Sequence, residues 1–259
     1  MEMNLSLQAL SLLAPQEDPM PTELPPRPFD SPRPISPSAS IAVPGFLARV
    51  YGWMATGLLV TAGAALFTVS NETVLRAVFG NRLVFYGLLF AELGLVVWLS
   101  GMVGKLSSAA ASAVFLLYSA LNGVTLASIF FAFTAGSIAS TFLVAAGTFA
   151  AMSVYGLTTH RTLDGLGSFA FMGLVGVIIA SVVNLFLRSN MLDFVVSCVG
   201  VIVFVGLTAY DTRRLKMMAL EVDGGSEAGR RGAISGALAL YLDFINLFLM
   251  MLRLFGNRR

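Results

Sequence analysis

The sequence has very few of the residues that carry chemistry in most enzymes. Among its 259 residues there is one cysteine, Cys198, and one histidine, His160. A single cysteine excludes an intramolecular disulfide and a metal cluster built on cysteine thiolates. The chain also lacks the HExxH, P-loop and dinucleotide-binding fingerprints, so nothing indicates a metallohydrolase or a nucleotide-driven pump. We therefore expect no cofactor and no enzyme activity.

Charge is scarce as well. Only 12% of the residues are charged, and the net charge of +2 is too small and too dispersed to favour nucleic acid as a partner. Proline is absent after residue 44, because all ten prolines lie within residues 1–45. That Pro-, Ser- and acid-rich segment cannot bury enough apolar area to offset the loss of chain entropy. We expect residues 1–45 to be a disordered, acidic tail and residues 46–259 to form the folded domain.

Long apolar segments dominate residues 46–259. Hydrophobic residues make up 57% of the chain, and its mean hydropathy is +0.83. A helix needs about 20 apolar residues to cross a bilayer, and seven segments qualify: 48–70, 82–102, 108–132, 137–157, 167–187, 192–211 and 233–254. The long charge-free stretch in the middle of the chain should break near Thr134–Ser137. The sequence thus predicts an all-α integral membrane protein with seven transmembrane helices, for which the lipid bilayer is the first partner.

The distribution of lysine and arginine predicts the orientation. One set of alternate loops, together with the N-terminal segment, holds nine basic residues, and the other set holds six. Because cytoplasmic loops carry the excess of basic residues, the N-terminus and the 211–232 loop are expected in the cytoplasm. The three arginines after residue 252 do not fit this pattern. A re-entrant seventh helix would return them to the cytoplasm and change the ratio to twelve against three, so both interpretations stay open.

Three acidic residues fall inside the apolar segments, where ionisable groups are costly and usually functional. Asp243 lies in the middle of the seventh segment, and its nearest basic residue, Arg253, is ten positions away. Asp211 ends the sixth segment directly before two arginines and could be an interfacial residue. Glu92 lies midway along the second segment and could be a neutral residue that joins helices, or the partner of Lys105. A protonated Asp243 that joins helices is the alternative to a functional one.

Other polar groups could support these acids. Asn246 follows Asp243 by three residues, so its amide lies on the same helical face and could donate to the carboxylate. Arg213 follows Asp211 at the helix end. His160 has no carboxylate or nucleophile placed near it by spacing, and we expect it at the surface.

Four stretches together resemble the transmembrane Bax-inhibitor-motif family in its bacterial branch. They are LARVYGWMATGLLVTAG, LLYSALNGVTLASIFFAFT, AYDTRRLK and LYLDFINLFLMMLRLFG, in this order within residues 46–259. The resemblance implies six helices around a central C-terminal helix, in a bacterial inner membrane. It also implies a pH-sensitive calcium leak, in which Asp211 and Asp243 form the pH-sensing carboxyl pair and Glu92 matches the family's helix-two glutamate.

One position departs from the family pattern. Bacterial relatives can carry an arginine eleven residues after the glutamate, where this chain has Val103, and Lys105 is the nearest substitute. Two carboxyls in a low-dielectric site cannot both ionise cheaply, so the pair would hold a shared proton. Ca²⁺ prefers six to eight oxygen ligands. With so few acids, we expect Asp211 and Asp243 to bind Ca²⁺ or another cation only weakly or transiently.

Two other functions compete with a leak. An intramembrane aspartyl protease also uses two aspartates on its sixth and seventh helices, and Tyr210-Asp211 fits its first motif. Its second motif should read Gly-x-Gly-Asp, whereas Leu240-Tyr241-Leu242 precedes Asp243 here. The other alternative is a non-transporting regulator of a stress response or of a membrane protease, which would then be a partner.

Overall fold

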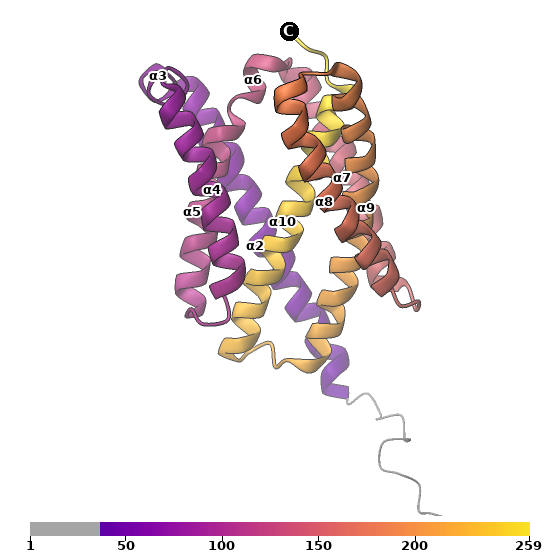
Figure 1. The fold of residues 1–259 in the computed structure, drawn as a ribbon. Helices are drawn as coiled ribbons and strands as arrows, with labels where there is room; N and C mark the ends of the chain where they lie inside the picture. Colours follow the sequence, from indigo (N-terminus) through magenta and orange to yellow (C-terminus); the bar gives the residue numbers. More distant parts are fainter. Residues whose placement is uncertain (1–36) are drawn as a thin grey trace, which may run out of the picture. The chain divides into compact units, whose positions relative to one another are not determined.

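The fold of this protein is known from a computed structural model, which describes residues 37–259 (Figure 1). These residues form helices joined by short connections. The helices are α2 (Pro37–Ser70), α3 (Glu72–Phe79), α4 (Arg82–Met102), α5 (Ser108–Leu126), α6 (Ile129–Ala132), α7 (Ala135–Thr158), α8 (Asp164–Leu187), α9 (Asn190–Glu221) and α10 (Glu227–Phe255). Within residues 37–259 there is no β-strand, and one isolated bridge joins Phe133 to Arg258.

The predicted all-α membrane architecture is confirmed. Among the described residues, seven helices are long and apolar enough to cross a membrane. The predicted break near Thr134 also occurs there, because the Thr134 side chain caps α7 by accepting a hydrogen bond from the backbone N–H of Ser137 at 3.3 Å. The short helices α3 and α6, which lie in the connections, were not predicted.

The predicted 211–232 loop is wrong. Helix α9 continues to Glu221 and α10 already begins at Glu227, so only a short turn separates them. Three of the five basic residues of this region lie on the extension of α9, and the other two lie on the first turns of α10. On α9, Lys216 donates to the carbonyl of Leu157 and Arg213 to that of Thr159, both at the end of α7. These contacts favour a continued helix over a loop, since cations stabilise the unpaired carbonyls of a helix C-terminus.

The N-terminal boundary of the folded domain also needs correction. Residues 37–45, predicted as part of the disordered tail, belong to α2, and Pro44 lies within that helix. The prediction of disorder for residues 1–36 falls outside the described part of the chain. A proline in the third turn removes one backbone hydrogen bond, but the apolar residues that follow continue the helix to Ser70.

Helix α10 occupies the centre of the bundle, as predicted. It packs against α9, α2, α7 and α5, while α4 packs on α5 and α8 packs on α9 in an outer layer (Figure 1). Burial follows the same order: 61% of the most apolar stretch of α10 is buried inside the protein, against 11% for α4 and for α8. Of the six surrounding helices, four therefore pack against the central helix. The other two, α4 and α8, pack mainly against α5 and α9.

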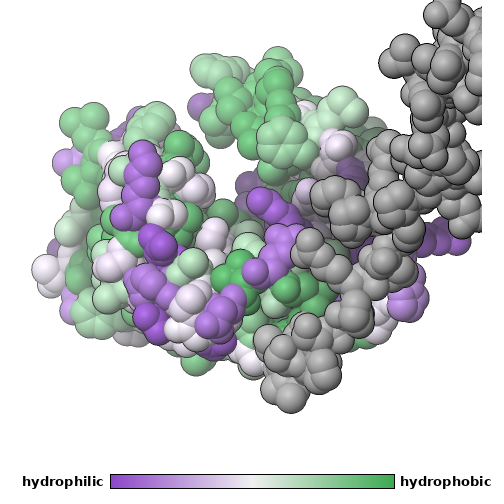
Figure 2. All heavy atoms as spheres, turned by 90° about the horizontal axis from the view of Figure 1, so that it is seen from below, coloured by the Kyte–Doolittle hydropathy of each residue, from purple (hydrophilic) through white to green (hydrophobic). Residues whose placement is uncertain are grey.

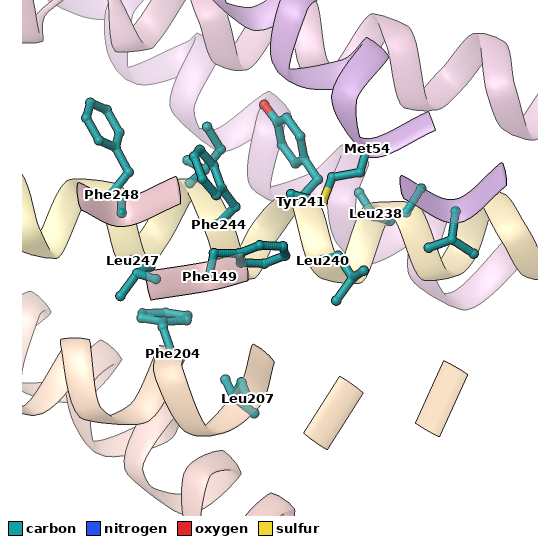
Figure 3. Close-up of a cluster of buried hydrophobic side chains, with 14 of the residues drawn as sticks. Met54, Phe149, Phe204, Leu207, Leu238, Leu240, Tyr241, Phe244, Leu247 and Phe248 are labelled. Carbon is teal, nitrogen blue, oxygen red and sulfur yellow. The ribbon is translucent and has the colours of Figure 1, made fainter. Parts of the chain in front are cut away.

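The core consists of apolar side chains that project from α10 to opposite sides (Figure 3). Phe244 meets Phe149 of α7 edge to face, with ring centroids 5.5 Å apart. Leu247 is completely buried on the side of α9, toward Phe204 (Figure 3). Edge-to-face ring pairs add stability beyond the area that they bury, so α10 fixes the positions of α7 and α9 through its own side chains.

The two ends of the bundle differ in character. One end, here called the 222–226 end, holds residues 103–107, 159–163 and 222–226, and hydrophilic residues gather on its face (Figure 2). The opposite 256–259 end is closed by the C-terminal residues, since Arg259 donates to Ala132 and Thr134 donates to Asn257 through the backbone. Because α10 runs from one end to the other as a single helix, the structure favours a spanning seventh helix over a re-entrant one.

Candidate functional site

The structure brings two of the three membrane-depth acids together. Asp211 on α9 and Asp243 on α10 lie at the closely packed α9–α10 contact, and their carboxyl groups are close enough for each to act on the charge of the other. Asp243 is almost completely buried, with 5% of its surface exposed, whereas Asp211 is half-buried. Two neighbouring carboxyl groups can share one proton, which one of them donates to the other.

The surroundings of Asp243 offer little else to satisfy it. Its Oδ2 atom is buried, and among residues 37–259 no N–H or O–H group donates to it. A buried carboxylate oxygen without a donor is costly, by about 1–3 kcal/mol or more. Whether the Asp243 carboxyl is charged or protonated therefore depends on the neighbouring carboxyl group of Asp211.

Asp211 lies closer to the edge of the bundle and has different neighbours. The positive charge of Arg214, three positions along α9, acts on its carboxyl group. The next residue, Thr212, is fully buried, and its hydroxyl lies 3.4 Å from the Tyr51 hydroxyl of α2 and 3.5 Å from Ser153 Oγ of α7. Asp211 is thus followed on α9 by a hydroxyl group that contacts α2 and α7, and by a cation that acts on its carboxyl group.

Glu92 belongs to a separate cluster. It is buried, with 6% of its surface exposed, and its two carboxyl oxygens lie 2.9 and 3.2 Å from Thr125 Oγ1 of α5. The same hydroxyl lies 2.9 Å from the Asn122 carbonyl, and one hydroxyl hydrogen cannot serve both acceptors. A protonated Glu92 would donate to Thr125 and leave the Thr125 hydrogen for the carbonyl.

Tyr241 joins this cluster to the central helix. Its hydroxyl lies 2.7 Å from Thr61 Oγ1 of α2 and donates to Asn122 Oδ1 of α5 at 3.1 Å. Tyr241 and Asp243 are two residues apart on α10, so their side chains point to nearly opposite faces. The structure therefore separates the Glu92 cluster from the aspartate pair by the body of α10.

The remaining predicted residues do not join the pair. The Asn246 amide donates to the Leu242 carbonyl of its own helix at 2.8 Å and not to Asp243, so this expected contact is wrong. Lys105 is exposed at the 222–226 end, and its side chain forms no hydrogen bond or ion pair with the residues that the structure describes. Arg213 holds the end of α7 through the Thr159 carbonyl.

Sequence reasoning missed several members of these clusters. The buried hydroxyls of Thr61, Thr125 and Ser153 were not singled out, because serine and threonine are frequent in apolar helices and often bond only to their own backbone. Arg214 was considered only as a possible interfacial neighbour of Asp211. Its spacing of three from Asp211, which places both on one face of a helix, is the signal that could have identified it.

The arrangement suits proton exchange better than tight metal binding. No group of three or more histidine, cysteine, aspartate or glutamate residues that could hold a metal ion occurs within the described chain. Two carboxyls alone supply fewer oxygens than Ca²⁺ prefers. What Asp211 and Asp243 can do is change their joint charge by one proton and attract a cation when that proton leaves.

Comparisons with known proteins agree on the relationship of this chain. The profile of the family described as "Inhibitor of apoptosis-promoting Bax1" matches residues 43–259. The inner membrane protein YbhL of Escherichia coli K12 is 52% identical over 226 residues, which cover 87% of this chain and 96% of YbhL. An uncharacterized protein of Borreliella burgdorferi is 50% identical over 214 residues, covering 83% of this chain and 92% of that protein.

More distant relatives match over the same length. An uncharacterized membrane protein of Streptococcus pyogenes serotype M6 is 36% identical over 225 residues, which cover 86% of this chain and 97% of that protein. These matches and the seven apolar helices identify a multi-pass membrane protein. The resemblance seen in the four sequence motifs is confirmed, and the chain belongs to the Bax-inhibitor family as a bacterial-type member.

Proposed function

We propose that this protein is a pH-sensitive leak pathway for calcium or another cation, gated by the Asp211–Asp243 pair. The observation that carries the proposal is the pair of neighbouring carboxyl groups between α9 and the central helix, with the Asp243 Oδ2 atom buried and without a donor among residues 37–259. The proposal assigns no catalytic step, no resident cofactor and no resident metal ion.

The gating argument rests on the charge of the pair. With one shared proton, the carboxyls attract each other and hold α9 against α10. Once that proton leaves, two negative charges lie side by side in a medium of low dielectric constant, where their repulsion is strong. The two helices can reduce this repulsion by separating or by admitting a cation between them. The pair thus couples the local pH to cation passage.

The membrane and the orientation are part of the same proposal. We place the protein in the bacterial inner membrane with its N-terminus in the cytoplasm. Eight of the described basic residues lie at the 222–226 end, namely Arg49, Lys105, Arg161, Arg213, Arg214, Lys216, Arg230 and Arg231. Six lie at the 256–259 end, namely Arg76, Arg82, Arg188, Arg253, Arg258 and Arg259. Because cytoplasmic loops carry the excess of basic residues, the larger number at the 222–226 end supports a cytoplasmic location for that end.

The test is a flux assay with the purified full chain in liposomes loaded with a calcium dye, over a series of pH values. The variants are Asp211→Asn, Asp243→Asn and the double variant. Asp211→Asn should shift the pH dependence of the leak, and Asp243→Asn should reduce cation passage more strongly because Asp243 lies on the central helix. The double variant should be no worse than the poorer single variant, as expected for groups that act as a unit.

Glu221→Gln is the matched control, since Glu221 is an exposed acid at the end of α9 that forms no ion pair within the described residues. It should keep the wild-type profile. Folded Asp211→Asn and Asp243→Asn variants that both leak with the wild-type pH profile would refute the gating role. A folded wild-type protein without any leak would favour the non-transporting regulator instead.

A further inference from the structure

A pocket at the 222–226 end lies beside the aspartate pair, since Tyr210 and Arg214 on either side of Asp211 line it, whereas neither aspartate does. Its volume is about 280 Å³, and it opens between the start of α8 and the last turns of α9. Tyr210, Arg213, Arg214 and Met217 line it from α9, and Asp164, the first residue of α8, lies on the other side. At about 30 Å³ for each water-sized group, this volume holds about nine such groups. A phosphate with part of an attached glycerol fits within it.

The two arginines are available to a ligand. Arg213 is half-buried, and one of its guanidinium nitrogens is fixed by the Thr159 carbonyl, which leaves its other N–H groups for a second partner. Arg214 is exposed, and among residues 37–259 its guanidinium forms neither a hydrogen bond nor an ion pair. A guanidinium matches the oxygens of a phosphate in shape and can bind two of them at once.

The acid in the pocket does not neutralise these arginines. Asp164 is exposed and makes no ion pair with either arginine in the described structure. The lining therefore keeps one net positive charge. An anion is favoured over a cation or a neutral group.

The position of the pocket points to a lipid. Asp164 begins a membrane-spanning helix, so the pocket lies where that helix enters the bilayer. The next turn of α8 exposes apolar side chains, with 61% of Phe169 exposed, and Met217 of α9 exposes 45%. Basic pockets between transmembrane helices at the membrane surface are suited to acidic headgroups. An acyl chain attached to a bound headgroup would find an apolar surface beside it.

We propose that this pocket binds a phosphate group, held by Arg213 and Arg214, and that its source is the headgroup of an anionic phospholipid. Free inorganic phosphate carries the same chemistry, and the experiment distinguishes the two sources. The test measures thermal stability and not ion flux, so its outcome does not depend on the proposed function.

The experiment measures the Tm of the purified full chain in a mild detergent during titration with three probes. They are dihexanoyl phosphatidylglycerol, dihexanoyl phosphatidylcholine as the zwitterionic reference, and inorganic phosphate. A ligand that binds only the folded state raises Tm with its concentration. The variants are Arg214→Gln, Arg213→Gln and Arg214→Lys. Arg49→Gln is the matched control, because Arg49 is an exposed arginine at the same end that does not line the pocket.

Phosphatidylglycerol should raise the Tm of the wild type and of Arg49→Gln. Arg214→Gln should weaken its apparent affinity about tenfold, the loss expected for one charge-assisted contact, and Arg214→Lys should recover part of it. Arg213→Gln also loses the bond to Thr159, so a folding defect in that variant leaves Arg214→Gln as the decisive one. A response to inorganic phosphate that disappears in Arg214→Gln would assign the site to free phosphate. The proposed phosphate site would be refuted if phosphatidylcholine raised Tm as much as phosphatidylglycerol does. It would also be refuted if phosphatidylglycerol raised the Tm of Arg214→Gln as much as that of the wild type.

Discussion

The hydroxyl of Tyr241 gives the sharpest test of the packing around the central helix. Tyr241→Phe removes one oxygen from a side chain that is completely buried. The ring keeps its edge-to-face contacts with Phe115 and Tyr118, whose centroids lie 5.7 and 5.9 Å away. The change therefore isolates the hydrogen bonds to Thr61 and Asn122 from the packing of the aromatic ring.

The expected cost follows from counting the groups left without partners. Thr61 can still donate its one hydroxyl hydrogen to the carbonyl of Gly57 or of Ser119, each at 2.9 Å, so this donor stays satisfied. Asn122 Oδ1 loses the donor that Tyr241 provides. A fully buried acceptor without a donor costs about 1–3 kcal/mol, and hydrogen bonds between membrane helices average about 0.6 kcal/mol. Asn122 is half-buried, so its cost lies in the lower part of this range. We expect a destabilisation of about 1–2 kcal/mol.

Thermal unfolding in detergent measures this effect. For a protein of this size, about 1–2 kcal/mol corresponds to a decrease in Tm of roughly 2–8 °C. Tyr155→Phe is the matched control, because 44% of Tyr155 is exposed and its hydroxyl has no partner in the described residues. If Tyr241→Phe unfolds at the same temperature as Tyr155→Phe, the hydrogen-bonded cluster does not stabilise the bundle.

Three further predictions concern packing, the tail and topology. Gly123→Ala should destabilise by about 1–3 kcal/mol, because its Cβ would collide with the backbone of α2, whereas Gly147→Ala, where a Cβ meets nothing within 4 Å, should leave Tm unchanged or raise it. Deletion of residues 2–36 should change the stability in detergent by less than about 0.5 kcal/mol, and a larger loss would show that the tail docks on the bundle. In a Cys198→Ala background, Gly225→Cys should react with a membrane-impermeant maleimide in inverted vesicles but not in intact cells, and labelling of intact cells would reverse the proposed orientation.

The helices themselves could be predicted from sequence because charge is so rare. Six of the seven predicted spans lie within one helix each, and the span 108–132 covers α5 and α6. The ends agree closely except at the start of α2 and around α9 and α10. The error there has a physical cause: a helix does not have to end where the membrane ends. Arg213 and Lys216 continue α9 beyond the apolar segment by binding the carbonyls at the end of α7. Contacts of this kind join distant segments and leave no signal in either one.

The contacts between helices were much harder to predict. In a soluble helix the polar residues mark the outer face, but in a membrane helix the lipid-facing side is as apolar as the packed side. The sequence therefore did not indicate which helices pack against α10. In the structure α2, α5, α7 and α9 do so, whereas α4 and α8 pack mainly against α5 and α9. The pairing of Asp211 with Asp243 was suggested by the family resemblance, whereas the contact of Glu92 with Thr125 needed the coordinates.

The central place of α10 has a consequence for the order in which the protein is made. The ribosome releases α10 after the six helices that surround it, so those helices enter the membrane before their common core exists. Until then, the inner faces of α2, α5, α7 and α9 have only lipid or one another to contact, and the buried hydroxyl of Thr61 lacks its partner on Tyr241. Helices inserted in this way associate only when packing and hydrogen bonds become available. Assembly of the bundle must therefore wait for Tyr241 and Asp243 to arrive, and a nascent chain that stops before Glu227 would present all six outer helices to the quality-control machinery without a core.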